Sequence, residues 1–191
     1  MYQSFVRALL RNPRQIGAVA PSGPSLARAM AKAAEPAGKR LLEIGPGTGV
    51  ITEALLERGA AKDDLYLLER DAALAAYLDR KFPDIRVIVG DARIISELVS
   101  PDMVGSFGVI VSSLPLLNMK EADKICILEQ IFSLLSPDGA LVQYTYSARA
   151  PLSPELADRF GVKGTRTTTV FRNIPPASVW KYSRDDGPDI R

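Results

Sequence analysis

Three acid-bearing motifs in the first half of the sequence have the residue types and spacing of a nucleoside-binding site. The first covers residues 43–49 and reads Glu-Ile-Gly-Pro-Gly-Thr-Gly. Glycines let a backbone turn tightly and approach a ligand closely. The spacing differs from the dinucleotide-binding G-x-G-x-x-G, and no lysine is present for a phosphate-binding loop. A tight strand-to-helix turn without a ligand remains an open alternative.

The second and third motifs each place a carboxylate at the end of a predicted strand. Glu69 lies 20 residues after Gly49, where a carboxylate can accept two hydrogen bonds from the hydroxyls of a ribose. In the third motif, Asp91 and Ala92 follow another apolar run, where they can contact the edge of an adenine. Each acid alone could be a plain surface charge, but three such strand ends in succession are more specific.

Short apolar runs and amphipathic stretches alternate along the chain and would position these motifs. We expect strands over residues 40–44, 65–68, 87–89, 109–111 and 140–146, and helices over residues 50–58, 71–82, 94–99 and 120–135. This alternation predicts a doubly wound parallel sheet with helices on both faces. Residues 165–171 and 178–182 are rich in β-branched and aromatic residues, which predicts an antiparallel hairpin at one edge.

Composition excludes several classes of function. The 191 residues suit one domain, and 47% hydrophobic and 24% charged residues are typical of a globular protein. The chain has no histidine, which excludes histidine triads and the usual zinc sites, and we expect no metal site. The single cysteine, Cys126, allows no internal disulfide and fits a reducing cytoplasm. We recognise no signal peptide and no apolar run of membrane-spanning length.

Charge is distributed unevenly along the sequence. Residues 1–34 hold five cations and no acid, residues 35–144 hold 11 cations and 17 acids, and residues 145–184 hold seven cations and two acids. If the basic ends meet in space, they form a positive face that attracts an anionic partner. Residues 2–11 read as a cationic amphipathic helix, which either packs on the core or lies on an anionic membrane surface.

The three motifs together resemble those of class I S-adenosylmethionine-dependent methyltransferases. The matching stretches are E-I-G-P-G-T-G, L-L-E-R-D and V-G-D-A, and the resemblance covers about residues 38–184. It implies an α/β fold: a Rossmann-like, doubly wound, seven-stranded sheet, mostly parallel with an antiparallel C-terminal hairpin. We expect one domain overall, with a basic amphipathic helix and a lead-in helix in residues 1–36 and the methyltransferase domain in residues 37–191.

The resemblance also implies the cofactor, S-adenosyl-L-methionine, and a role for each matching residue. Gly45, Gly47 and Gly49 line the methionine and ribose part of the cofactor. Glu43 lies below the loop and reaches the methionine amine through a neighbour or water, and Glu69 binds the ribose. Arg70 lies beside the adenine, and Asp91 and Ala92 contact the adenine edge.

The segment after the fourth predicted strand points to the class of methyl acceptor. It reads Ser112-Ser-Leu-Pro-Leu-Leu-Asn118. Adenine N6-methyltransferases carry Asn or Asp, then x-Pro, then an aromatic residue that stacks on the base. Here the polar position is serine and a leucine follows Pro115, so no ring stacks on a base. Ser112 and the backbone carbonyl of Leu114 still suit an amine acceptor, and the apolar wall of Leu114, Leu116 and Leu117 favours a lipid.

More specifically, the chain is similar to bacterial phospholipid N-methyltransferases over residues 11–22, 112–118 and 172–180. This similarity implies methyl transfer to the amine of phosphatidylethanolamine, with repeated transfer towards phosphatidylcholine left open. The expected partners are an anionic membrane surface and a phospholipid substrate, with no stable nucleic-acid partner. We expect a cytoplasmic protein at the inner face of the membrane, and its oligomeric state stays open.

Further residues are candidates for contact with the substrate. Tyr144 and Tyr146 could present an oxygen or a ring to an ammonium group, or simply pack in the core. Candidates for the lipid phosphate are Arg14, Ser22, Arg149 and Arg172, each of which could also be an ordinary surface residue. Three other functions stay open: an rRNA or DNA adenine methyltransferase, a small-molecule methyltransferase, and a non-catalytic cofactor-binding protein.

Overall fold

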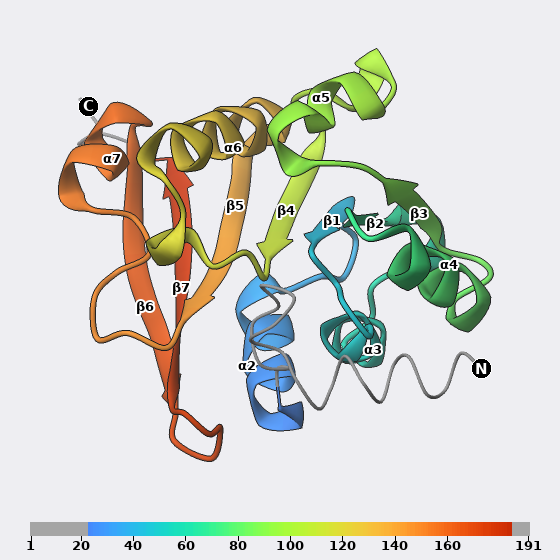
Figure 1. Cartoon of the computed structure of the whole chain (residues 1–191), viewed down its shortest axis with the longest axis horizontal. Helices are drawn as coiled ribbons and strands as arrows, with labels where there is room; N and C mark the ends of the chain where they lie inside the picture. Colours follow the sequence, from blue (N-terminus) through green and yellow to red (C-terminus); the bar gives the residue numbers. More distant parts are fainter. Residues whose placement is uncertain (1–22, 185–191) are drawn as a thin grey trace.

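The computed structural model describes residues 23–184, which form a seven-stranded sheet with helices on both faces (Figure 1). The strand order is β3-β2-β1-β4-β5-β7-β6; β1 to β5 run parallel, and β7 is antiparallel to both β5 and β6. This arrangement confirms the predicted fold class, including the C-terminal hairpin. The strands are β1 (Leu41–Ile44), β2 (Leu65–Glu69), β3 (Arg86–Val89), β4 (Phe107–Ser112), β5 (Leu135–Thr145), β6 (Val162–Val170) and β7 (Ala177–Arg184).

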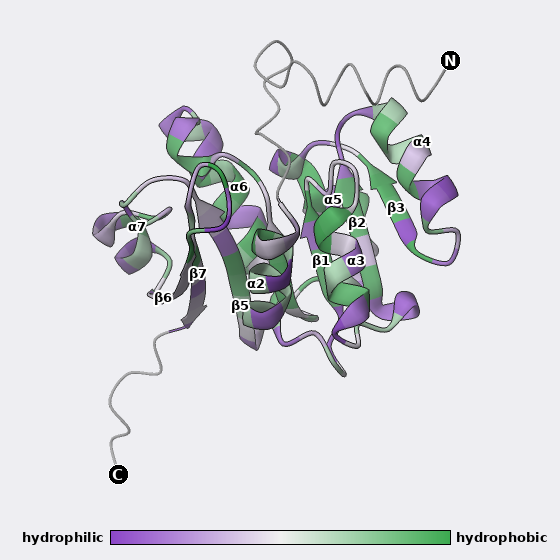
Figure 2. Ribbon diagram, turned by 90° about the horizontal axis from the view of Figure 1, so that it is seen from below, coloured by the Kyte–Doolittle hydropathy of each residue, from purple (hydrophilic) through white to green (hydrophobic). Residues whose placement is uncertain are grey.

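Two hydrophobic cores lie on the two faces of the sheet. One packs beneath α2 (Pro24–Ala34), α3 (Val50–Glu57) and α4 (Ala72–Lys81). The other packs beneath α5 (Ile95–Leu98), α6 (Glu121–Leu134) and α7 (Pro154–Arg159). The central strands are largely hydrophobic and the helices alternate in hydropathy, as expected when a strand is buried on both sides and a helix on one (Figure 2).

Helix starts and ends follow the local sequence. The helix after β2 begins with an acidic cap: the Asp71 carboxylate accepts hydrogen bonds from the backbone N–H groups of Ala73 and Leu74. This places the start of α4 directly after Glu69. Helix α2 buries its apolar side in the same core as the sheet, so the chain from residue 23 onwards belongs to the same folded unit. The predicted cationic helix over residues 2–11 lies outside the described residues.

The fifth strand differs from the sequence-based expectation. The Ser-Pro-Asp-Gly stretch at residues 136–139 was expected to separate helix from strand, but β5 begins already at Leu135. Phe107 of β4 pairs with Leu135 and Val109 pairs with Ala140, so residues 136–139 of β5 bulge opposite the single residue Gly108. A Cβ on Gly139 would lie 2.8 Å from the carbonyl oxygen of Phe107, and glycine is the residue that permits this close approach of two backbones.

Strands β1 and β4 are neighbours at the point where the strand order reverses. The chain leaves β1 towards β2 and β3, whereas it leaves β4 towards β5 and the hairpin. In open α/β sheets, ligands bind in the crevice beyond the carboxyl ends of the strands at such a switch point. The glycine-rich loop after β1 and the acceptor segment after β4 therefore face each other across the expected binding crevice.

Candidate active site

The glycine-rich loop after β1 adopts a backbone that glycine makes accessible. Gly45, Gly47 and Gly49 have φ values of 73°, 58° and 80°, in the left-handed region. A Cβ on Gly47 would meet no atom within 4 Å, so this part of the loop has open space beside it. A Cβ on Gly49 would lie 2.5 Å from the ring of Phe82, so the third glycine allows α4 to pack against the start of α3.

Glu69 connects the end of β2 to the glycine-rich loop. Its carboxylate accepts one hydrogen bond from the backbone N–H of Gly47 at 3.2 Å and one from that of Asp71 at 3.0 Å. The side chain is 8% exposed and therefore fixed in orientation. An ionised carboxylate can accept about four hydrogen bonds, so two further positions remain for the hydroxyls of a ribose. The geometry is compatible with the predicted role of Glu69.

Glu43 lies in β1, two residues before the loop, and is fully buried. One carboxylate oxygen accepts a 2.7 Å hydrogen bond from the hydroxyl of Thr52 in α3, and the other, Oε1, has no partner in the structure. Burial raises the pKa of Glu43 to about 8; the Thr52 bond opposes this shift and the negative charge of Glu69 adds to it. A buried, unpaired acid oxygen beneath a ligand-binding loop is free to accept a polar contact from a ligand.

The third motif shows a contact that the sequence did not predict. Asp91 caps the 3-10 turn Ala92–Ile94, and its carboxylate also accepts bonds from the guanidinium of Arg93 at 2.9 and 3.1 Å. These bonds lower the pKa of Asp91 below its ordinary value. Arg93 in turn reaches Asp123 of α6. An adenine would therefore have to share this carboxylate with Arg93, while Ala92 is buried and Arg70 is exposed nearby.

The acceptor segment after β4 is held by hydrogen bonds within the protein. Ser112 is fully buried, and its hydroxyl accepts from the backbone N–H of Leu114. The carbonyl of Leu114 accepts from Gln143 Nε2 and from the N–H of Leu116, both at 2.9 Å. A carbonyl oxygen has two lone pairs, so an incoming amine would have to displace one of these bonds. A direct contact between Ser112 and a substrate would likewise require the segment to open.

The predicted apolar wall is smaller than expected. Leu116 is buried in the core beneath α6, because residues 116–118 turn inward as a 3-10 helix. Leu117 is 39% exposed and Leu114 is half-buried, so these two side chains remain at the rim. A Cβ on Gly45 would lie 3.6 Å from Leu114, which shows that the rim borders the glycine-rich loop.

Two tyrosines stand at the end of β5 on the same face of the sheet as Glu43. Their rings contact each other edge to face, with centroids 5.4 Å apart. Tyr144 is buried in the core and Tyr146 is half-buried and packed against it. The pair therefore both packs the core and reaches the edge of the sheet where the parallel strands end.

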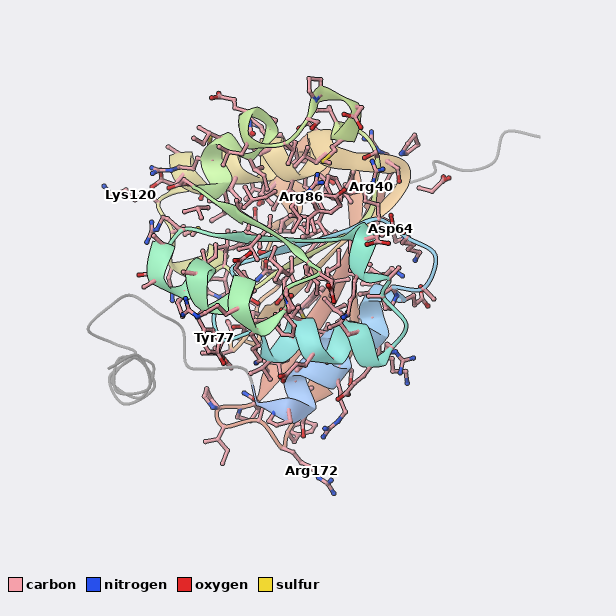
Figure 3. All side chains as sticks on the ribbon, turned by 90° about the vertical axis from the view of Figure 1, so that its right-hand side faces the viewer. Arg40, Asp64, Tyr77, Arg86, Lys120 and Arg172 are labelled. Carbon is pink, nitrogen blue, oxygen red and sulfur yellow. The ribbon has the colours of Figure 1, made fainter. Side chains whose placement is uncertain are left out.

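Two of the four candidates for the lipid phosphate lie within the described residues. Arg149 is exposed in the loop after β5, and Arg172 is exposed in the turn between β6 and β7, where it extends away from the body of the molecule (Figure 3). Both segments belong to the sheet edge at which the parallel strands end. Arg14 and Ser22 lie outside the described residues. Their roles in lipid binding stay predictions.

Sequence reasoning missed three side chains that shape the site. Gln143, in β5, binds the carbonyls of Leu114 and Tyr144 and joins the ends of β4 and β5. Lys81 donates to the carbonyl of Thr48 in the glycine-rich loop. Arg93 binds Asp91. Only Gln143 left a signal in the sequence, as a lone amide within an apolar strand.

Comparison with known protein families decides the class of this protein. A family model described as a methyltransferase domain matches residues 41–139, more than half of the chain. The chain belongs to this methyltransferase family. The matched region runs from the start of β1 to the bulge in β5, and so contains all three acid-bearing motifs and the acceptor segment.

Known relatives of this methyltransferase act on different acceptors. An ornithine lipid N-methyltransferase of Singulisphaera acidiphila is 26% identical over 92% of both chains. A ribosomal RNA small subunit methyltransferase A of Paraburkholderia xenovorans is 36% identical, but over only 51% of this chain and 38% of its own length. In fold, the chain is similar to a 1,6-didemethyltoxoflavin-N1-methyltransferase of Burkholderia thailandensis, solved with S-adenosylhomocysteine, with a TM-score of 0.69, 17% identity and coverage of 97% of this chain and 87% of that one.

The protein is an S-adenosylmethionine-dependent methyltransferase. Its site residues fit this cofactor. The open space beside Gly47 leaves room for the ligand backbone, Glu69 keeps free lone pairs at the strand end, and the unpaired Glu43 Oε1 offers a buried acceptor for an amine. Among residues 23–184, no group of three His, Cys, Asp or Glu could hold a metal ion.

Proposed function

We propose that this methyltransferase transfers methyl groups from S-adenosylmethionine to the amine of phosphatidylethanolamine, at the cytoplasmic surface of a membrane. Transfer can be repeated on the same nitrogen towards phosphatidylcholine. The observation that carries the proposal is the segment after β4: the residue after Pro115, where adenine methyltransferases have a stacking ring, is Leu116, and its side chain is buried in the core. An aliphatic rim of Leu114 and Leu117 suits the apolar part of a lipid and offers no platform for a base.

The relatives support a lipid amine over a nucleobase. Of the two sequence relatives described above, the ornithine lipid N-methyltransferase aligns along almost the whole of both chains. Two ribosomal RNA small subunit methyltransferases A align over 51% and 79% of this chain but over only 38% and 49% of their own lengths, so each contains a large part that this alignment does not cover. Ornithine lipid and phosphatidylethanolamine both present an amine to solvent from a membrane-bound molecule, so the shared chemistry is an amine at a lipid surface.

The residues of the chain must orient a neutral amine and keep water away. S-adenosylmethionine supplies a methyl group that its sulfonium already activates. Orientation of two reacting groups is worth about 7–11 kcal/mol, so positioning is the main task of the site. Because the carbonyl of Leu114 is occupied by Gln143 and Leu116, we assign positioning of the amine to the tyrosine pair at the end of β5. Attraction between a methylated ammonium and an aromatic face is worth about 0.5–2 kcal/mol and increases with desolvation.

One acceptor assay tests the proposal. The protein is incubated with S-adenosylmethionine carrying a labelled methyl group and, in parallel, with vesicles containing phosphatidylethanolamine, vesicles containing ornithine lipid, and small-subunit rRNA. We expect label in phosphatidylethanolamine. Label in ornithine lipid alone would show that ornithine lipid is the acceptor in place of phosphatidylethanolamine, and the acceptor would still be a lipid amine. Label in rRNA alone, with none in either lipid, would contradict the proposal.

A further inference from the structure

The turn between β6 and β7, residues 171–176, exposes apolar side chains to an unusual degree. We call this turn the hairpin tip. Among residues 23–184, the two most exposed large hydrophobic side chains both belong to it: Phe171 is 79% exposed and Ile174 is 93% exposed. Exposed apolar groups that lie close together commonly mark a surface that another molecule covers. Arg172 stands between them in the sequence and extends away from the protein body (Figure 3).

The hairpin tip is anchored to the rest of the fold at its centre. Asn173 is 5% exposed; its Oδ1 accepts from the N–H of Gly23 at the start of α2, and its Nδ2 donates to the carbonyl of Pro175. Farther down the hairpin, Tyr182 is 1% exposed and its hydroxyl accepts from the N–H of Leu152. The exposed side chains are therefore presented on a turn that both strands and α2 hold in place.

The position of the hairpin tip relates it to the active site. Because β7 runs antiparallel to β5, Ser178 at its start pairs with Thr145 at the end of β5. The hairpin tip thus projects from the edge at which the parallel strands end, beyond the other strands (Figure 1). Any flat surface that contacts the tip would face the crevice between the glycine-rich loop and the acceptor segment.

The surrounding charge fits an anionic surface. Strands β6 and β7 and their turn contain no Asp or Glu, and α2 contains none either. Lys181 of β7 forms an ion pair with Glu35 at the end of α2. The cations of α2 and of the hairpin are Arg28, Lys32, Arg166, Arg172 and Lys181, together with Lys163 and Arg184, which lie at the end of the hairpin away from the tip and take no part in this surface.

We propose that the hairpin tip is a membrane-docking wedge: Phe171 and Ile174 enter the interface of an anionic bilayer while Arg172 contacts lipid phosphates. This inference rests on the proposed function, because both require the protein to bind the surface of a lipid bilayer. Aromatic and aliphatic residues flanked by cations favour the boundary between headgroups and acyl chains. RNA could use the cations and Phe171 but not the isolated aliphatic Ile174, so a bilayer fits the whole tip better. Docking here turns the active-site edge towards the lipid amines.

Vesicle binding tests the wedge without requiring catalysis. The full chain is sedimented with vesicles of phosphatidylglycerol and phosphatidylcholine, which lack phosphatidylethanolamine. Phe171→Ser with Ile174→Ser should weaken binding about tenfold, equivalent to about 1.4 kcal/mol, and Arg172→Gln about fivefold at low salt. The matched controls are Val104→Ser, an exposed apolar residue just before β4 at the opposite edge, and Arg184→Gln at the far end of β7. Both controls should bind as the unaltered chain does.

A second readout separates this inference from the proposed function. The double variant should methylate phosphatidylethanolamine in vesicles about tenfold more slowly, yet methylate a short-chain monomeric phosphatidylethanolamine at the unaltered rate. If the unaltered chain methylates neither form while the tip still governs vesicle binding, the proposed acceptor fails and the wedge stands. Unchanged vesicle binding by the double variant overturns the wedge. Three other results, each with vesicle binding intact, would also overturn the wedge. A lower melting temperature of the double variant would mean that another segment of the chain covers the tip. Loss of a dimer would mean that a second copy covers it, and loss of rRNA binding would mean that RNA does.

Discussion

At the scale of single residues, Glu69 connects two of the three predicted motifs. Its carboxylate accepts from Gly47 and Asp71, and we expect Glu69→Gln to weaken binding of S-adenosylhomocysteine about 10- to 100-fold. The reason is that a neutral amide offers one acceptor oxygen where two are needed. Isothermal calorimetry measures the affinity, and Glu57→Gln, an exposed acid at the end of α3, is the control. Equal affinities for the two variants would contradict the role of Glu69.

The buried acid Glu43 makes stability depend on pH. Its pKa is raised to about 8 in the folded protein from an ordinary value of 4.5, so the folded state binds more protons than the unfolded state between these pH values. The free energy of unfolding should therefore fall as pH rises from about 4.5 to 8, by on the order of a few kcal/mol from this group. In Glu43→Gln that contribution should vanish. Urea unfolding across this pH range checks it, and identical pH profiles for the two proteins would refute it.

The sequence indicated the types of the cofactor residues but not all of their contacts. Gly47, Gly49 and Glu69 were predictable, because motif spacing reports backbone turns and strand ends that are local in the chain. The bond between Asp91 and Arg93 was not, because Arg93 is oriented by an acid on α6, which lies far along the sequence. The unpaired oxygen of Glu43 likewise depends on how α3 packs over β1.

At the scale of elements, the third glycine sets how α4 packs on the cofactor loop. Gly49→Ala would place a methyl group against Phe82, in addition to the strain of a positive φ. Gly38 is the matched control, since it has a φ of 71° and no atom within 4 Å of an added Cβ. We expect Gly38→Ala to destabilise by about 1–2 kcal/mol and Gly49→Ala by about 1–3 kcal/mol more. Equal losses in chemical unfolding would show that Phe82 imposes no constraint.

Gln143 couples the two elements that border the acceptor side. Gln143→Met removes both donated bonds, and we expect a loss of about 1–3 kcal/mol in unfolding free energy because carbonyls in the interior lose a partner. We also expect kcat to fall while affinity for S-adenosylhomocysteine is unchanged, since the bond fixes the acceptor segment and not the cofactor loop. Gln130→Met is the control: its amide oxygen joins α6 to Ser96, away from the acceptor segment. A fall in kcat of the same size in both variants would assign Gln143 a purely structural role.

The order of the elements was predictable, whereas the details of β5 were not. Strands β1, β2 and β4 are mostly apolar and buried, as is typical of strands between two helical layers, whereas the edge strand β3 is a short apolar run after Arg86. The Ser-Pro-Asp-Gly stretch has the composition of a turn, yet it lies within β5 because the backbone of Phe107 approaches Gly139. That approach depends on the pairing of β4 with β5, which composition alone does not reveal. The inward turn of Leu116 was missed because its burial depends on packing in the core beneath α6.

At the scale of the whole molecule, the fold places the cofactor motifs, the acceptor segment and the hairpin tip at one edge of the sheet. The family and the cofactor class followed from the sequence, because the three motifs lie in the conventional order along the chain. The acceptor could not be derived in the same way, since relatives with similar motifs act on lipid and on RNA. The exposed residues of the hairpin tip became apparent only once its neighbours in space were known. Among residues 23–184, none of the helices combines the length and apolar character needed to cross a bilayer.

The most direct test follows the methyl group itself. The protein is incubated with S-adenosylmethionine bearing a deuterated methyl group and with mixed vesicles of phosphatidylethanolamine and phosphatidylglycerol, and the extracted lipids are fragmented in a mass spectrometer. We predict that deuterium appears on the headgroup nitrogen of phosphatidylethanolamine, and that Glu69→Gln lowers its amount. Active protein, shown to bind S-adenosylhomocysteine, that leaves this nitrogen unlabelled would contradict the account.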